Sequence, residues 1–163
     1  MKGVLTIVAL VAVLALGAVT AASAEEPTRQ QYVEQVEPIC KANTEANQRI
    51  LENAKERAKS RNPAKMRQAG AQFIHASVVF GKSVQKIAAV PRPAADDVRL
   101  VKWFKQLGVV REKLRKLGVA LKAGEEIKAA HEQIRVERAS NAANNFGFAF
   151  KFHYCRLTAS RFT

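Results

Sequence analysis

The chain has 163 residues, and its 27 Lys and Arg residues outnumber 14 Asp and Glu residues, which gives a net charge of +13 at pH 7. A charge of this sign and size favours anionic partners such as nucleic acid, anionic lipid headgroups or acidic wall polymers. The length suits a single domain with one modest core and argues against a multidomain assembly.

Residues 1–24 have the layout of a secretory signal peptide. A short positive start precedes an almost unbroken apolar run over residues 4–19, and a stretch of small residues closes the segment. This pattern predicts cleavage at an Ala-x-Ala site before Glu25. Cleavage would leave one domain of residues 25–163 with a net charge of +12, because Lys2 is lost. The alternative is an uncleaved membrane anchor, since the run is about long enough to span a thin bilayer.

Cys40 and Cys155 are the two cysteines of the chain and lie near the two ends of the mature protein. In an exported protein they allow one intramolecular disulfide, which would stabilise the fold by about 4 to 5 kcal/mol by closing a long loop. An intermolecular bridge and free thiols are the alternatives. A redox motif is disfavoured because no Cys-x-x-Cys occurs.

The first helix is predicted from a capping signal. Thr28 is followed three residues later by Gln31, which places the helix start just before Tyr32. Pro38 is expected to kink this helix or to begin its main part, because proline removes one backbone donor and clashes one turn back. The expected inner face consists of Tyr32, Val36, Ile39, Asn43, Ala46, Ile50 and Ala54.

Two further helices have clear start and stop signals. Asn62 as a cap and Pro63 at the first helical position predict the second helix, which the proline-rich residues 91–93 end. Acidic residues from Asp96 onward predict the start of the third, because they compensate the positive end of the helix dipole. Gly124 can adopt the left-handed conformation that ends it.

The third helix is strongly basic, with eight Lys and Arg residues between positions 98 and 122 against Glu112 alone. We interpret part of this set as an anion-binding surface, although a run of charges is often just a solvated face. The candidate residues are Arg99, Lys102, Lys105, Lys113, Arg115 and Lys116. A second basic group spans the connection between the first two helices and comprises Lys55, Arg57, Lys59, Arg61, Lys65 and Arg67.

The last segment is predicted to be a helix that begins at Glu125 and Glu126. Its apolar face carries Ile127, Ala130 and Ile134 and continues into Arg138, Asn141 and Asn145. Aromatic residues at every second position over residues 146–154 favour a strand instead. We favour a helix that continues past Gly147, because a lone strand would have no sheet to pair with.

Four amphipathic segments with short connections predict an all-α fold, an up-down-up-down four-helix bundle closed by one disulfide. In that topology the start of the first helix and the end of the fourth lie at the same end of the bundle. Cys40 and Cys155 would therefore meet there.

Several polar residues fall on the expected inner faces, and they define a candidate pocket. These residues are Asn43, His131, Arg138, Asn141 and Asn145. Buried amides need partners, so this set would form either a structural network near the disulfide or a cavity for a ligand. A haem or metal site with His131 and Met66 as ligands is an alternative. No cofactor or metal is predicted, because the three histidines do not converge and no metal-binding motif occurs.

Enzymatic chemistry has no support in the sequence. The serines lie in no nucleophile-elbow context, and no Gly-rich phosphate loop precedes a helix. Glu125 and Glu126 are better explained as compensation of a helix dipole than as a catalytic carboxylate pair. We therefore expect a protein that is not an enzyme.

Tyr32-Val33 and Glu37-Pro38-Ile39-Cys40 follow the predicted signal peptide, and the four predicted helices and a terminal Gly and Cys come after them. This layout resembles a group of small secreted actinobacterial proteins. The resemblance implies a helical, disulfide-closed exported product with no assigned activity.

The expected function is that of a secreted, non-enzymatic binding or scaffold module at the cell envelope. Its basic helix faces would contact an anionic polymer or lipid surface, and export makes nucleic acid the least favoured partner. After cleavage the protein would not be integral to a membrane. The alternative function is a carrier of a small ligand or a haem-like cofactor, held in a polar cavity of the bundle.

Overall fold

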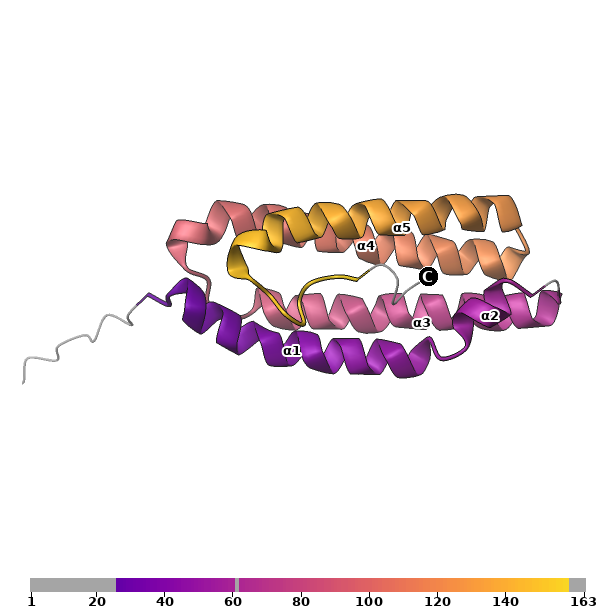
Figure 1. Cartoon of the computed structure of the whole chain (residues 1–163), viewed down its shortest axis with the longest axis horizontal. Coiled ribbons are helices and arrows are strands. Elements are labelled where there is room, and N and C mark those ends of the chain that lie inside the picture. The colour runs from indigo at the N-terminus through magenta and orange to yellow at the C-terminus, as the bar shows by residue number, and fades with distance from the viewer. Residues whose placement is uncertain (1–25, 61, 159–163) are drawn as a thin grey trace, which may run out of the picture.

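The computed structural model describes residues 26–60 and 62–158 of the chain (Figure 1). Its α-helices are α1 (Arg29–Ile50), α2 (Ala54–Ala58), α3 (Pro63–Ala88), α4 (Asp97–Ala123) and α5 (Glu126–Gly147). Short 3-10 turns, Ala94–Asp96 and Phe148–Phe150, precede α4 and follow α5. The described part has no strand, so the all-α prediction is confirmed, whereas the predicted count of four helices missed α2. The predicted signal peptide lies outside the described residues.

Helix boundaries follow the local capping signals. Thr28 and Gln31 form the capping box of α1, in which each side chain accepts a hydrogen bond from the other residue's backbone N–H. Asn62 caps α3 by accepting from its first two N–H groups, and Gly124 ends α4 with a φ of 73°. Pro38 lies inside α1, so the alternative that it begins the main part of this helix is wrong.

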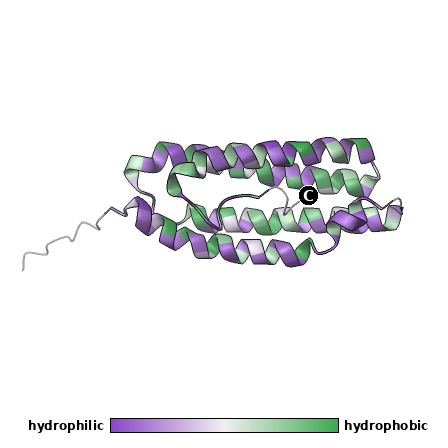
Figure 2. Ribbon diagram, viewed as in Figure 1, coloured by the Kyte–Doolittle hydropathy of each residue, from purple (hydrophilic) through white to green (hydrophobic). Residues whose placement is uncertain are grey.

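The core lies between the long helices, where α3 packs on α4, α4 on α5 and α1 on α3. Figure 2 shows apolar stretches along the sides of the helices that face one another. The fully buried side chains include Tyr32, Val36, Leu100, Trp103, Leu114 and Val136. Where α3 crosses α4, a Cβ on Gly70 would lie 2.5 Å from the carbonyl oxygen of Gly118. Glycine at both positions therefore permits backbone contact between these helices.

The predicted inner face of the last helix is wrong. Ile127 and Ile134 are 77 % and 46 % exposed. The residues of α5 that are buried are Ala129, Glu132, Val136, Ala139, Ser140, Ala143 and Gly147. Most of these are small, and small side chains let α5 approach the neighbouring helix closely. The two isoleucines dominated the apolar pattern of the sequence, but close packing selected a different face.

The predicted continuation of the last helix past Gly147 is also wrong, and so is the strand alternative. A 3-10 turn follows α5, Lys151 takes a left-handed conformation with a φ of 52°, and the chain then runs back along the bundle without regular structure (Figure 1). Phe152 is buried, with ring centroids 5.0 Å from Trp103 and 5.1 Å from Phe150. Burial of these aromatic rings against the core favours the turn over further helix.

An ion pair joins the start of α1 to the start of α4. Arg29 donates two hydrogen bonds to Asp96, at 2.7 and 2.8 Å, and Asp96 is only 4 % exposed. Hydrogen bonding from Arg29 is the main reason why the pKa of Asp96 lies below its ordinary value, with the charges of Arg29 and Arg99 adding to the effect and burial opposing it. The carboxylate therefore stabilises the fold only while it is ionised.

Acid is expected to weaken this attachment. Because the pKa of Asp96 is lower in the folded chain than in the unfolded chain, its stabilisation is present above the unfolded pKa and is lost as the pH falls through the folded pKa. Asp96→Asn should lower the urea midpoint at pH 7 and flatten its dependence on pH in the acid range. Asp97→Asn is the control, because Asp97 forms an exposed ion pair with Arg92. An unchanged acid dependence in Asp96→Asn would contradict the assignment.

Candidate functional site

The structure divides the six predicted anion-binding residues into two groups, and all of them lie on α4. Lys113, Arg115 and Lys116 are within ion-pair distance of a carboxylate. Among the described residues, Arg99, Lys102 and Lys105 have no carboxylate within that distance. We call these last three the free basic face.

Carboxylates neutralise part of the first group. Glu112 accepts hydrogen bonds from Arg115 at 2.8 and 3.0 Å, and Lys116 Nζ lies 3.7 Å from the same carboxylate. The Arg115 hydrogen bonds are the main reason why the pKa of Glu112 is lowered to about 2. Lys113 Nζ lies 3.9 Å from Glu132, a buried carboxylate on α5. These cations are less available to an external anion than the free basic face.

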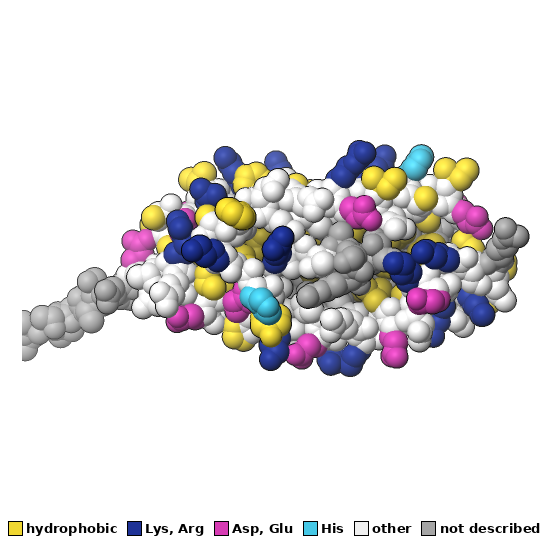
Figure 3. All heavy atoms as spheres, in the orientation of Figure 1, with side chains coloured by type: hydrophobic (Ala, Val, Ile, Leu, Met, Phe, Trp, Pro, Cys, Tyr) yellow, Lys and Arg dark blue, Asp and Glu magenta, His cyan; other side chains and the backbone are white. Residues whose placement is uncertain are grey.

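Exposed apolar side chains accompany the free basic face. Val98 and Val101 are 71 % and 51 % exposed on the N-terminal part of α4. Val98 lies within about one turn of Arg99 and Lys102, and Val101 lies within about one turn of all three cations. Cations and protruding apolar groups thus share one surface. Positive charge is not confined to this surface: Figure 3 shows Lys and Arg side chains spread along the length of the face in view.

The second basic group lies around α2. Lys55 on α2 and Lys59, the C-cap residue of α2, are exposed, whereas Arg57 is half-buried and donates to the Gln72 side chain at 3.0 Å. Lys65 and Arg67 are exposed at the start of α3, and Arg61 lies outside the described residues. The group therefore includes one structural member, Arg57, and several cations that face solvent.

The predicted pocket residues do not converge. Asn43 is half-buried on α1, while the four predicted residues from α5 are exposed: His131, Arg138, Asn141 and Asn145. Asn141 and Asn145 do line a surface groove between α5 and the C-terminal segment, together with Asn144. The inward-facing cavity built from all five residues is therefore absent, because α5 presents its other face to the core.

The buried amide on α1 is Asn47, which sequence reasoning missed. It is 3 % exposed and donates to the Asn43 side chain at 3.0 Å, while its own side-chain oxygen, Oδ1, has no hydrogen-bond partner in the described part. Asn47 lies seven residues, or about two turns, after Cys40, which is also buried. Cys40 as a core position could have identified the correct face.

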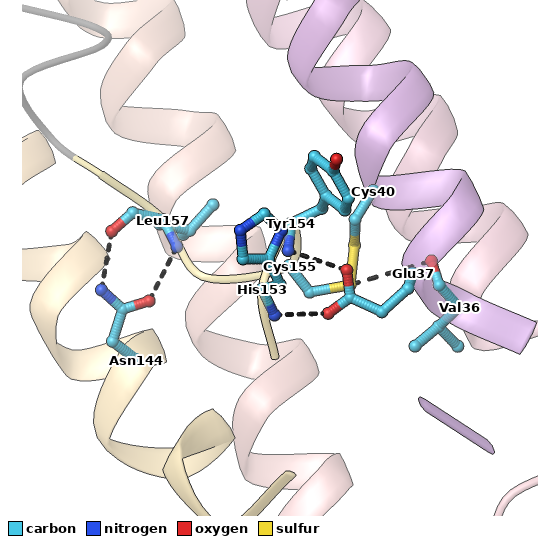
Figure 4. The surroundings of a disulfide bond; sticks show 8 residues. All are labelled: Val36, Glu37, Cys40, Asn144, His153, Tyr154, Cys155 and Leu157. Carbon is cyan, nitrogen blue, oxygen red and sulfur yellow. Dashed lines mark hydrogen bonds between the residues drawn. A yellow bond between two sulfur atoms is a disulfide. The ribbon is translucent and has the colours of Figure 1, made fainter. Parts of the chain in front are cut away.

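The predicted disulfide between Cys40 and Cys155 is confirmed. It joins α1 to the C-terminal segment, residues 151–158, and two polar side chains fasten the same segment (Figure 4). Glu37 accepts hydrogen bonds from the backbone N–H groups of His153 and Tyr154, at 2.6 and 2.7 Å.

Asn144 on α5 provides the second attachment of this segment. Its side-chain oxygen accepts from the Leu157 N–H at 2.8 Å, and its amide nitrogen donates to the Leu157 carbonyl at 2.7 Å. Sequence reasoning missed both Glu37 and Asn144, because their partners are backbone groups more than ten residues away. The arrangement closes one side of the bundle with an irregular segment rather than with a helix.

The part of the chain that the structure describes holds neither a metal-binding cluster nor a helix suited to span a membrane. No group of three or more His, Cys, Asp and Glu side chains is placed to hold a metal ion. Within the same ranges, none of the helices combines the length and the apolar content needed to cross a bilayer.

Comparisons with known proteins add no relative. No protein-family model, curated protein or solved structure matches this chain.

Proposed function

We propose that this protein is a secreted, non-enzymatic binding or scaffold module at the cell envelope, which contacts an anionic lipid or polymer surface through the free basic face. The observation that carries the proposal is the combination of Arg99, Lys102 and Lys105 with exposed Val98 and Val101 on one part of α4. Such a face suits an anionic lipid surface, because the cations are attracted to the headgroups and the apolar side chains can enter the interface.

Other features support export and a rigid scaffold. The sequence carries a predicted signal peptide, and a disulfide is compatible with an oxidising compartment outside the cytoplasm. We propose the up-down-up-down order for the four long helices, with the C-terminal segment tied across them. The resemblance to small secreted actinobacterial proteins agrees with this proposal.

The carrier alternative has less support in its original form. It relied on a polar cavity in the bundle, but four of the five residues named for that cavity are exposed on α5. A surface function does not require them.

Binding to vesicles tests the proposal. The protein should sediment with phosphatidylglycerol vesicles at low ionic strength, bind neutral phosphatidylcholine vesicles weakly, and lose binding as salt screens the attraction. Lys102→Gln/Lys105→Gln should weaken binding roughly ten- to thirtyfold, since each cation near an anionic surface contributes about 1 kcal/mol. A preparation of acidic wall polymer in place of vesicles tests the other source of negative charge.

A matched variant controls for net charge. Arg115→Gln/Lys116→Gln removes the same charge about 20 Å along α4, beyond the screening length of physiological salt. It should weaken binding much less, because Glu112 already offsets part of that charge. Equal binding to neutral and anionic surfaces at low salt, or equal losses in both double variants, would refute the proposal.

A further inference from the structure

A hollow of about 280 Å³ is lined by residues of α2, α3, α4 and α5. The short helix α2 lies toward the right-hand end of the molecule in Figure 1. We call the hollow the α2 pocket. Its floor is apolar and consists of Met66 and Phe73 from α3, Leu117 and Leu121 from α4, and Ala129 from α5. Each of these side chains is at least 95 % buried. The volume is near the lower end of the range for small-molecule sites, about 300–1,000 Å³.

The mouth of the α2 pocket is charged, and cations predominate. Lys55 on α2 and Lys59, the C-cap residue of α2, line it, and neither lies within ion-pair distance of a carboxylate in the described part of the chain. Glu126, at the start of α5, is the one acidic side chain among the described residues that line the pocket. Long lysine stems can lie along apolar surface while their ammonium groups reach solvent. The mouth therefore favours an anionic group above an apolar floor.

The position of α2 is fixed without any ligand. Ala54 is 1 % exposed and anchors α2 in the core. Gln72 on α3 donates to the carbonyls of Ile50 and Glu52, at 2.7 and 3.0 Å, and thereby holds the turn between α1 and α2. Arg57 donates to the Gln72 side chain and to the same Glu52 carbonyl. Lys55 on α2 and Lys59 at its C-cap are thus carried by backbone that is already in place, which lowers the cost of ordering a site.

We propose that the α2 pocket binds an anionic single-chain amphiphile, with a medium-length acyl chain against the apolar floor and its carboxylate between Lys55 and Lys59. Ser60 and Gln133 are the other polar side chains of the lining. The five floor side chains offer no hydrogen-bonding group, which favours a hydrocarbon chain over a polar group against the floor. The volume suits one chain rather than two. This site uses none of the residues of the free basic face, so it goes beyond surface attachment and does not depend on it.

Isothermal titration calorimetry of the mature chain with decanoate tests this inference. One decanoate should bind per chain, and octanoate should bind roughly tenfold more weakly, because it buries two fewer methylene groups. Decanol should bind more weakly than decanoate, since it lacks the charge, and decyltrimethylammonium should bind most weakly. Equal affinity for the anionic and cationic probes would overturn the role of the lysines.

Variants locate the site. Ala130 is exposed and lines the α2 pocket, so Ala130→Trp should block it without requiring room in the core, and decanoate binding should be lost. Ala71→Trp, at an exposed position of α3 that does not line the pocket, should leave binding unchanged. Lys55→Gln/Lys59→Gln should weaken decanoate binding about tenfold and bring it close to that of decanol.

Lys102→Gln/Lys105→Gln separates the two proposals, because it should reduce vesicle binding and leave decanoate binding intact. Absence of decanoate binding to the wild type, or binding that persists in Ala130→Trp, would overturn the α2 pocket whatever the vesicle result. Loss of vesicle selectivity alone would leave the pocket proposal standing.

Discussion

Replacing Gly118 with alanine is expected to lower the free energy of unfolding by about 3 kcal/mol, because overpacking of a well-filled core costs about 1–3 kcal/mol and more where backbone must move. A Cβ at Gly118 would lie 2.6 Å from the carbonyl oxygen of Gly70 and 2.9 Å from the backbone nitrogen of Ile74. Neither atom can move away without shifting α3. The variant should therefore separate α3 from α4 and lower the urea midpoint.

Gly108→Ala is the matched control on the same helix. A Cβ at Gly108 would meet no atom within 4 Å, so alanine should fit and should raise stability by about 0.5–1 kcal/mol through its better helix propensity. Urea unfolding followed by circular dichroism measures both variants. The free energy of unfolding should fall in Gly118→Ala and rise in Gly108→Ala. Destabilisation of similar size in both variants would mean that the close approach of Gly70 and Gly118 does not cause the loss of stability.

Removal of the disulfide should have the other large effect. Cys40 and Cys155 are 115 residues apart, and closing a loop of this size stabilises a fold by about 4 to 5 kcal/mol through the entropy of the unfolded chain. The double variant Cys40→Ala/Cys155→Ala should therefore unfold at a temperature about 10–15 °C lower than the wild type. Differential scanning calorimetry measures the change.

Thiol titration provides the companion measurement. The folded wild type should show no free thiol, and reductant should act slowly until the chain unfolds, because Cys40 and Cys155 are only 7 % and 3 % exposed. Glu37→Gln is a useful comparison, since it weakens the hydrogen bonds to the His153 and Tyr154 N–H groups but keeps the disulfide. Glu37→Gln should lower the unfolding temperature less than the double cysteine variant does. An unchanged unfolding temperature in the double variant would contradict the stabilising role of the bridge.

Local signals identified the capping residues of the helices, although α1 begins at Arg29, earlier than the predicted start just before Tyr32. Thr28 with Gln31, and Asn62 with Pro63, specify helix starts through hydrogen bonds and backbone angles within a few residues. The disulfide was also predictable, because two cysteines leave one intramolecular pairing. Such features do not depend on which face of a helix meets the core.

Features that need a partner elsewhere in the chain were missed. The orientation of α5 depends on small residues such as Ala139 and Ala143, which weigh little in an apolar pattern but allow close packing. The candidate pocket failed for this reason, since His131 and Arg138 share the outer face with Ile134. Likewise, the sequence did not show that Lys113 on α4 lies near a carboxylate, because that carboxylate belongs to Glu132 on α5.

The sequence by itself determined the all-α character, the capped helix starts, the strong positive charge and the pairing of Cys40 with Cys155, because these depend on composition or on a few consecutive residues. Tertiary structure alone decided which face of α5 is buried, how residues 148–158 close the bundle, and that α2 holds two lysines over an apolar hollow. The physical reason is that close packing and long-range hydrogen bonds combine residues far apart in the chain, and their energies outweigh the local apolar pattern.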